Sequence, residues 1–229
     1  MGDRVCVIDD DAASRETLQR LFRSVGVDHA TFDTAEAFLQ QLPSNGCGCI
    51  VADIRLRGMS GLELMEVLQK NKLMIPVVIV SGFATMRTAV RAMRMGALSV
   101  LSKPVDEEEL WSTVREGLSQ YAVASQRLNR RKELQQSFAS LTPQEQTVAD
   151  AVIDGCTNKV IAEKLSVSVR TVEARRHNVL HKTGAQSIPE LVKLWLASKD
   201  PEEMLDILYS RPPGDIDPQA WDFGDRAAG

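Results

Sequence analysis

The sequence lacks any long hydrophobic run. No apolar stretch in its 229 residues approaches the roughly 20 residues of a membrane-spanning helix, and the first residues lack the pattern of a signal peptide. We therefore expect no membrane association and a cytoplasmic location. With 44% hydrophobic and 25% charged residues, the chain has the composition of one large or two ordinary globular domains.

The cysteines do not form the pattern of a metal or disulfide site. They are Cys6, Cys47, Cys49 and Cys156, and the close pair Cys47 and Cys49 has no second cysteine pair or histidine pair to complete a zinc site. Cys6 lies in an apolar run and Cys156 stands alone, so both are interpreted as small buried hydrophobic residues.

The chain also lacks the excess of positive charge that is typical of a nucleic-acid-binding protein. Its net charge is −4, but the charge is distributed unevenly. Residues 1–120 carry −3, residues 121–198 carry +4 and residues 199–229 carry −5. This asymmetry allows the middle segment to bind DNA although the whole chain is acidic.

Three consecutive carboxylates, Asp9, Asp10 and Asp11, follow the apolar run at residues 5–8. Like charges repel, and each carboxylate loses solvation when it is drawn toward a core. A single aspartate is enough to cap the following helix. The others indicate that a cation binds there.

The first 120 residues alternate short apolar runs with amphipathic segments. This pattern predicts an α/β doubly wound fold with a five-stranded parallel sheet and helices on both faces. The predicted strands are 4–9, 28–32, 49–53, 76–81 and 98–101, and the predicted helices are 14–26, 34–42, 60–71, 85–96 and one that begins near Asp106. In such sheets the ligand site lies at the carboxyl ends of the strands.

Polar side chains stand at those carboxyl ends. Asp9 and Asp10 end the first strand, Asp53 the third and Ser81 the fourth, and Lys103 follows the fifth. Each alone has an ordinary interpretation, as a helix cap, a loop residue or a solvated lysine. Together they predict one crevice lined by carboxylates, a hydroxyl and an ammonium.

Residues 1–120 resemble the receiver domain of two-component response regulators, and the domain itself is predicted at residues 1–118. The resemblance is carried by the stretches "VIDDD", "VADIRLRGMSGLEL", "IVSG" and "LSKPV". It implies a flavodoxin-like fold in which Asp53 is the phosphoacceptor and Ser81 and Lys103 bind the phosphoryl oxygens. It further implies a Mg²⁺ ion held by Asp9, Asp10, Asp53 and the backbone carbonyl of Arg55, and a cis Lys103–Pro104 peptide bond.

Two positions depart from the receiver pattern. Arg57 stands where the family usually has proline, and Val100 stands where it has an aromatic residue that swings inward during switching. Valine cannot make that movement, so the departure concerns how the signal leaves the site and not phosphorylation.

Residues 119–140 are predicted to form a helical linker, because they contain neither glycine nor proline. Leu118, Tyr121, Ser125 and Leu128 follow the spacing of a coiled-coil seam. The basic cluster at residues 130–132 is equally compatible with a solvated helix face.

Residues 141–198 carry the signals of a small helical domain. Thr142, Pro143 and Glu145 begin a helix as cap, first residue and capping-box partner. A helix at 158–165, a tight turn and a second helix at 169–183, capped by Ser168, then form a helix-turn-helix.

The second of these helices, 169–183, has two faces. Val172, Val179, Leu180 and Thr183 form its packed side. The opposite face predicts base-edge contacts in the major groove from Arg170, Glu173, Ala174, His177, Asn178 and His181. The residues placed to reach DNA phosphates are Lys159, Lys164, Arg175, Arg176 and Lys182. An ordinary amphipathic surface helix is the alternative.

Residues 141–196 resemble the LuxR-type helix-turn-helix, on "LTPQEQTV", "NKVIAEKLSVSVRTVE" and "HNVLHKTGA". With the receiver, the chain resembles transcription regulators of the FixJ/NarL type. The resemblance implies a sensor histidine kinase and double-stranded promoter DNA as partners, and a homodimer on phosphorylation. One departure is Arg175, where the family commonly has histidine. No acid/base pair or nucleophile constellation occurs in this half, so we expect a regulator and not an enzyme.

Residues 199–229 form an acidic tail outside both resemblances. One helix capped by Asp200 is predicted, and the remainder is predicted to be disordered. The tail could compete with DNA for the basic segment or simply be solvated. Two alternative functions stay open. One is a constitutive DNA-binding regulator whose receiver is a dimerisation scaffold, and the other is a phosphoryl-relay module whose second domain binds protein.

Overall fold

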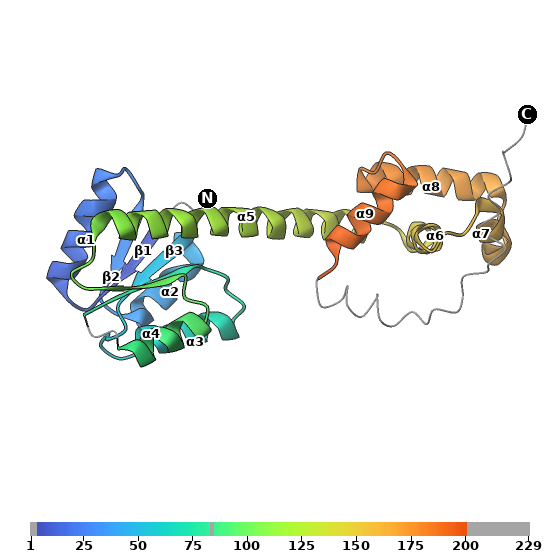
Figure 1. The fold of residues 1–229 in the computed structure, drawn as a ribbon. Coiled ribbons are helices and arrows are strands. Elements are labelled where there is room, and N and C mark those ends of the chain that lie inside the picture. Colours follow the sequence, from blue (N-terminus) through green and yellow to red (C-terminus); the bar gives the residue numbers. More distant parts are fainter. Residues whose placement is uncertain (1–3, 83–84, 201–229) are drawn as a thin grey trace, which may run out of the picture. The chain divides into compact units, whose positions relative to one another are not determined.

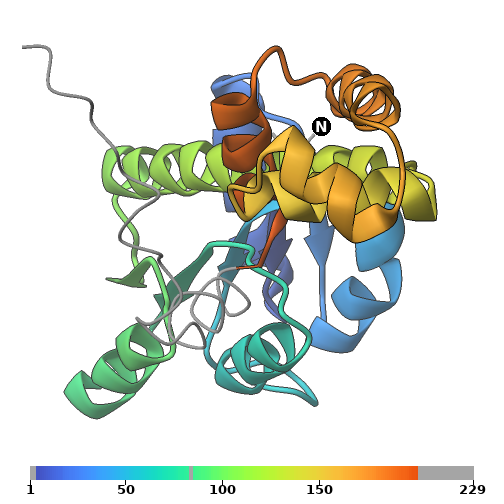
Figure 2. The ribbon, with the colours of Figure 1, turned by 90° about the vertical axis from the view of Figure 1, so that its right-hand side faces the viewer.

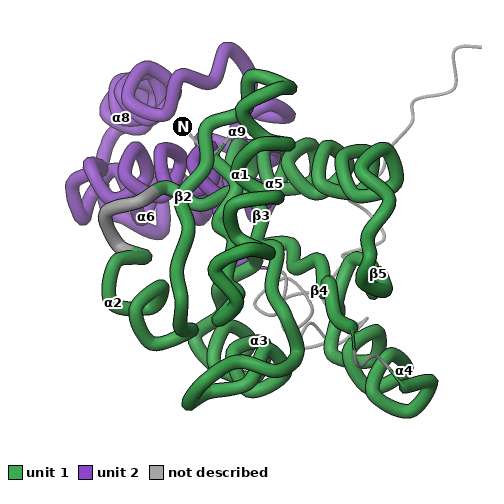
Figure 3. Tube along the Cα trace, turned by 90° about the vertical axis from the view of Figure 1, so that its left-hand side faces the viewer, with its two compact units in different colours: residues 1–127 green, residues 128–229 purple. Residues whose placement is uncertain are grey.

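The computed structural model describes residues 4–82 and 85–200, without the side chains of residues 43–45. Residues 201–229 of the acidic tail, with the helix predicted after its cap Asp200, lie outside the described residues. The chain divides into two compact units, residues 1–127 and 128–229, and the division falls within one long helix (Figure 3).

The first unit is built on a five-stranded parallel sheet, as predicted. The strands are β1 (Arg4–Ile8), β2 (His29–Phe32), β3 (Cys47–Ala52), β4 (Val77–Ser81) and β5 (Ser99–Ser102). Their order is β2-β1-β3-β4-β5 and every neighbouring pair is parallel. The order reverses between β1 and β3, which is where a doubly wound sheet opens its ligand crevice.

Helices cover both faces of this sheet. They are α1 (Ala12–Ser24), α2 (Ala35–Asn45), α3 (Gly61–Lys70), α4 (Met86–Arg94) and the first part of α5 (Glu107–Ala139). One face packs against α1 and α5 through Phe22, Leu110 and Val114, and the other packs against α2 and α3 through Phe38 and Leu64 (Figure 1). Every residue of β3 and β4 is buried, which explains why the strands are apolar throughout and do not alternate.

The second unit is helical. It contains the end of α5, α6 (Pro143–Ile153), α7 (Asn158–Leu165), α8 (Val169–Thr183) and α9 (Ile188–Ser198), coloured from yellow to red-orange in Figure 2. Thr142 caps α6 in a capping box with Glu145, and Ser168 caps α8, as predicted. Helix α9 was not predicted, although Ser187 caps it and Pro189 stands in its first turn.

The last turns of α5 pack within the second unit. Leu134 and Phe138 are buried there, and Gln135 Nε2 donates to the carbonyl oxygen of Ser198 at 2.9 Å. Residues 119–139 of the predicted helical linker lie within α5, and the boundary between the units falls inside this segment.

Among residues 4–82 and 85–200, no helix combines the length and the hydrophobicity needed to cross a membrane. The described cysteines are unbridged, and burial of Cys6 confirms its interpretation as a core residue, whereas Cys156 is only partly buried. Cys47 and Cys49 are also buried. Burial raises the pKa of the Cys49 thiol to about 12, so this thiol stays protonated at neutral pH.

Candidate functional site

The ends of four strands bring Asp9, Asp53, Ser81 and Lys103 together. Ile8 pairs with Ala52 in the register of β1 and β3, so Asp9 and Asp53 both leave the sheet one residue later, side by side. The amide of Asp53 donates to the carbonyl of Ile8 at 3.0 Å, and the amide of Lys103 donates to the carbonyl of Ser81 at 3.1 Å. These backbone bonds fix the positions from which the side chains project.

The side chains form one connected polar cluster. Lys103 Nζ donates to Asp9 Oδ2 at 2.5 Å and to Asp53 Oδ2 at 2.8 Å, while Ser81 Oγ donates to Asp53 Oδ1 at 2.6 Å. The carboxylates of Asp9 and Asp53 are only 3% and 10% exposed. Both carboxylates thus direct an oxygen at the same cation.

The charge on Lys103 is stabilised by these contacts. Partial burial disfavours the charged ammonium, but its hydrogen bonds and charge attraction to Asp53 and Asp9 outweigh burial and raise the pKa of Lys103. The lysine is therefore cationic at neutral pH, and it offsets the repulsion between two carboxylates that share one crevice.

The loop after Asp53 folds closely around that residue. The amide of Arg55 donates to Asp53 Oδ1 at 3.0 Å, and the amide of Gly61 donates to the carbonyl of Ile54 at 3.0 Å. A Cβ atom at position 61 would lie only 2.2 Å from the carbonyl oxygen of Asp53. Glycine is therefore required for α3 to begin this close to the strand end.

The other two aspartates of the triplet have different partners. Asp11 caps α1 by accepting from the amides of Ala13 and Ser14, which confirms the capping role expected of one aspartate. Asp10 is partly exposed and forms an ion pair with Arg57, with Nε and Oδ2 3.6 Å apart. The arginine that replaces the family's proline thus contacts a predicted metal ligand.

The residues at this edge fit a hard divalent cation. The donors are carboxylate oxygens, which Mg²⁺ prefers, and Mg²⁺ proteins often supply only one or two carboxylates because the ion keeps several waters. Asp9 and Asp53 already converge on the positive charge of the Lys103 ammonium, as they would on a metal ion. In the described part of the chain no three acidic, histidine or cysteine side chains are grouped for metal binding, in keeping with the pairing of Asp10 with Arg57.

The second unit presents the two faces predicted for α8. Val172, Val179 and Thr183 are buried and Leu180 is partly buried. The six residues assigned to base-edge contacts are all exposed: Arg170, Glu173, Ala174, His177, Asn178 and His181. The two faces predicted for α8 are thereby confirmed, and its polar face is available to a partner of this unit.

The residues assigned to phosphate contacts fall into two groups. Lys159 and Lys164 are exposed, whereas Arg175, Arg176 and Lys182 make contacts inside the unit. Arg175 donates to Gln144 Oε1 at 3.2 Å, Arg176 donates to Asn158 Oδ1, and Lys182 Nζ lies 2.6 Å from Glu145 Oε2.

Among the described residues of this unit, Glu145 is the acid whose pKa departs most clearly from its ordinary value. The hydrogen bond from Lys182, followed by the one from the Thr142 amide, lowers the pKa of Glu145 to about 2. The same carboxylate thus closes the capping box of α6 and binds a lysine of α8. Sequence reasoning identified the cap but not the link to α8, nor the roles of Gln144 and Asn158.

Comparison with known proteins supports the resemblance found for each half of the chain. Residues 5–115 match the response regulator receiver domain, and residues 139–195 match the luxR family of bacterial regulatory proteins. The transcriptional regulatory protein FixJ of Bradyrhizobium diazoefficiens is 37% identical over 83% of this chain and 93% of its own length. The response regulator protein TodT of Pseudomonas putida is 36% identical over 87% of this chain and 89% of its own.

The chain belongs to the FixJ/NarL-type response regulators. It is a transcription regulator that joins a receiver domain to a LuxR-type DNA-binding domain. The structure of the response regulator StyR is similar to it, with a TM-score of 0.77, 39% identity and coverage of 84% of this chain and 97% of that one. Full-length FixJ from B. japonicum has a TM-score of 0.52 at 36% identity, over 86% and 97% of the chains.

This response regulator keeps the cis Lys103–Pro104 peptide that the resemblance predicts. Val100 lies in β5 and packs, partly buried, against the core that contains α2 and α3. Its side chain has no ring to rotate. The departure at position 100 is therefore a real difference in β5, the strand that leads to Lys103.

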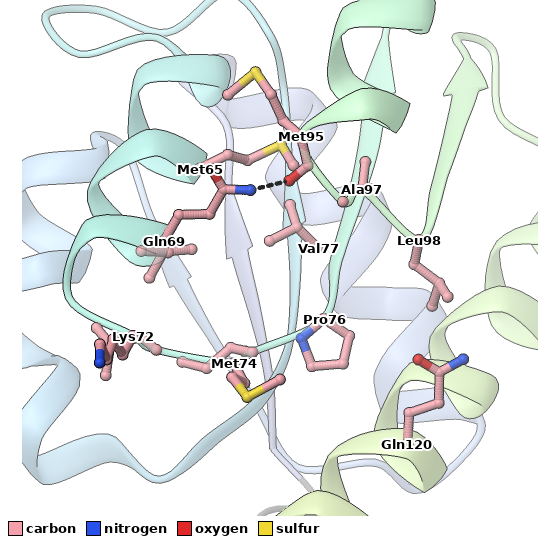
Figure 4. Close-up of a pocket in the computed structure, with 14 residues that line it drawn as sticks. Met65, Gln69, Lys72, Met74, Pro76, Val77, Met95, Ala97, Leu98 and Gln120 are labelled. Carbon is pink, nitrogen blue, oxygen red and sulfur yellow. Dashed lines mark hydrogen bonds between the residues drawn. The ribbon is translucent and has the colours of Figure 1, made fainter. Parts of the chain in front are cut away.

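A groove of about 520 Å³ lies elsewhere on the receiver of this response regulator. Residues from the end of α3, the loops before β4 and β5, and α5 line it, among them Met65, Met74 and Met95 (Figure 4). Gln69 Nε2 donates across it to the carbonyl of Met95 at 2.7 Å. It includes none of the polar residues at the carboxyl ends of the strands, so it is separate from the predicted phosphorylation site.

Proposed function

We propose that Asp53 accepts a phosphoryl group from a sensor histidine kinase and thereby controls dimerisation and DNA binding. The observation that carries the proposal is the cluster at the strand ends. Asp53 is a buried carboxylate with one oxygen bound by the Ser81 hydroxyl and the other by the Lys103 ammonium. A carboxylate held in this way is positioned as a nucleophile.

Each group has a defined part in the transfer. An oxygen of Asp53 bonds to phosphorus while the bond from phosphorus to the donor's histidine nitrogen breaks, and that electron pair stays on the nitrogen. Lys103 and Ser81 then donate hydrogen bonds to the phosphoryl oxygens in place of their present bonds to Asp53. Asp9, Asp10, Asp53 and the carbonyl of Arg55 would hold Mg²⁺, which neutralises phosphoryl charge when it is bound.

The second domain supplies the output. Helix α8 would enter the major groove with its exposed face toward the bases. Two copies brought together by phosphorylation would engage paired half-sites, and the gain in affinity would come from linking two weak contacts. Lys159 and Lys164 are exposed cations available to the DNA backbone.

The test compares the unmodified chain with Asp53→Asn and with Asp11→Asn as matched control. Asparagine is also a good cap, so Asp11→Asn keeps the start of α1 and removes a carboxylate close in sequence to the site. Acetyl phosphate with Mg²⁺ should label the unmodified chain and the control but not Asp53→Asn, because an amide cannot form the acyl phosphate. Equal labelling of Asp53→Asn would refute the assignment.

The same samples, treated with beryllofluoride and Mg²⁺, measure the output. Light scattering should show a shift from monomer to dimer, and fluorescence anisotropy should show tighter binding to promoter DNA. Val100 favours one alternative, a constitutive DNA-binding regulator in which the receiver is only a dimerisation scaffold. That alternative predicts labelling of Asp53 with no change in mass or in DNA affinity.

A further inference from the structure

The helix-turn-helix surface carries more positive charge than its own residues neutralise. Residues 158–183 contain six lysines and arginines against two glutamates. Within the described ranges of the chain, Lys159, Lys164 and Arg170 take part in no ion pair, and all three are exposed. These three residues, called here the α7–α8 cations, are available to an anionic partner.

An anionic segment of the same chain follows this domain directly. Residues 201–229 contain seven acidic and two basic residues and lie beyond residue 195, where the luxR-family match ends. The segment begins next to Asp200, whose carboxylate is bound by Arg131 Nη1 at 2.8 Å. The hydrogen bond from Gln135 to Ser198 also holds the end of α9. The start of the segment is thus fixed on the unit that contains α8.

The segment is long enough to reach α8. A compact unit of this size has a radius of gyration of about 11 Å, whereas residues 201–229 can span roughly 100 Å at full extension. A tether of this length keeps the acidic residues at an effective concentration in the millimolar range near every surface of the unit. A weak contact that would be negligible between separate molecules is therefore populated within one chain.

We propose that residues 201–229 bind the α7–α8 cations when DNA is absent and compete with DNA for them. The proposal rests on DNA binding by this domain. Carboxylates accept the same charge-assisted hydrogen bonds from lysine and arginine as phosphate oxygens do. The basic cluster of α5 is a poorer site, because Arg130 and Arg131 already pair with Glu133 and Asp200.

Such a contact makes the tail an electrostatic inhibitor of DNA binding. Its contacts with Lys159 and Lys164 lower affinity for every DNA sequence alike, because at these two lysines carboxylates replace phosphate contacts and not base contacts. Its effect falls as salt rises, because both the tail contact and the DNA contact are screened. Phosphorylation would overcome this inhibition, because a dimer that binds two half-sites gains more affinity than the tail contact removes.

The experiment uses the full chain in three forms. The first is unmodified and the second carries Arg211→Gln and Arg226→Gln, which make the tail more acidic. The third carries amides at all seven acids of the tail: Glu202→Gln, Glu203→Gln, Asp206→Asn, Asp215→Asn, Asp217→Asn, Asp222→Asn and Asp225→Asn. Anisotropy gives the Kd of each form for a labelled random-sequence duplex at 50 and 200 mM KCl.

The expected changes have opposite signs. At 50 mM KCl the amide form should bind about 5- to 10-fold more tightly than the unmodified chain, and the more acidic form about 2-fold more weakly. At 200 mM KCl both differences should fall below about 2-fold, since the Debye length is then near 7 Å. Equal Kd values for all three forms at 50 mM KCl would overturn the proposal while leaving DNA binding intact. Absence of DNA binding by all three forms would instead overturn the proposed function, and this proposal with it.

A peptide of residues 201–229 separates binding from simple repulsion of DNA by a charged tail. Added to the amide form, the unmodified peptide should bind saturably and be displaced by DNA, and Lys164→Gln with Arg170→Gln should weaken its binding several-fold. A peptide that does not bind, or that DNA does not displace, shows that the tail does not occupy the α7–α8 cations and refutes the proposal.

Discussion

Replacing Gly61 with alanine tests how the loop after Asp53 is shaped. The new Cβ would lie 2.2 Å from the carbonyl oxygen of Asp53, whereas real Cβ contacts are essentially never below 3.0 Å. The obstacle is the backbone of Asp53 itself, so no rotation of a side chain relieves the contact. Either the start of α3 or the peptide of Asp53 must move by roughly 1 Å.

This displacement should affect both stability and chemistry. Overpacking of this kind costs about 1–3 kcal/mol of unfolding free energy, which corresponds to a decrease in Tm of several degrees for a domain of this size. Movement of Asp53 also spoils its alignment with Ser81 and Lys103. A misplacement of about 1 Å can slow a reaction by roughly 100-fold, so labelling by acetyl phosphate should slow substantially.

The assay follows unfolding of the receiver by the fluorescence of Trp111. This side chain packs against the core formed with α1 and α5, and Trp195→Phe and Trp221→Phe remove the other two tryptophans. Gly82→Ala is the matched control, because its Cβ would meet only Lys103 Cβ, at an ordinary 3.8 Å. If Gly61→Ala were as stable and as readily labelled as Gly82→Ala, the account of the Asp53 loop would be wrong.

Three further predictions concern the two sites. Asp9→Ala and Asp10→Ala should each weaken Mg²⁺ binding measured by calorimetry, because a hard cation loses an oxygen ligand; unchanged affinity in both would count against the metal site. His177→Ala should narrow the difference in affinity between a selected site and random duplex, whereas Lys164→Ala should weaken binding to both; equal losses would contradict the assignment of the groove face. The low pKa of Glu145, about 2 against an ordinary 4.5, adds stability above pH 4.5 that is lost as pH falls toward 2. Glu145→Gln should therefore flatten that part of the acid-unfolding curve of the second unit, and an unaltered curve would refute the role of the carboxylate.

The receiver site could be predicted from sequence because a parallel sheet converts chain order into spatial proximity. Once the strands are placed, Asp9, Asp53 and Ser81 must meet at one edge, and the structure brings them within hydrogen-bonding distance of one another or of Lys103. The strand positions were visible because strands buried on both faces form continuous apolar runs. No knowledge of side-chain partners was needed for either step.

The partners of charged side chains could not be predicted in this way. Arg57 pairs with Asp10 and Lys182 with Glu145 because helices and loops pack at particular angles, and a sequence pattern shows only that a residue is charged. Helix α9 was missed for another reason. The helix-turn-helix pattern is complete with two helices and does not call for α9, although Ser187 caps this helix and Pro189 lies in its first turn.

The internal contacts of α8 give some of its cations a structural role in addition to, or in place of, a contact with DNA phosphates. Arg176 and Lys182 fasten the helix to Asn158 of α7 and Glu145 of α6, so each has a structural role before any DNA is present. When a residue that only neutralises a phosphate is replaced, the slope of the logarithm of the DNA-binding constant against the logarithm of the salt concentration decreases by about 1. A residue that positions the recognition helix changes affinity for the selected site with little change in slope, because the base contacts lose their alignment. The slope therefore separates the two roles. The slope should decrease when Lys159 or Lys164 is replaced. It should stay nearly constant when Lys182 is replaced, because the Lys182 ammonium is already bound to the buried carboxylate of Glu145.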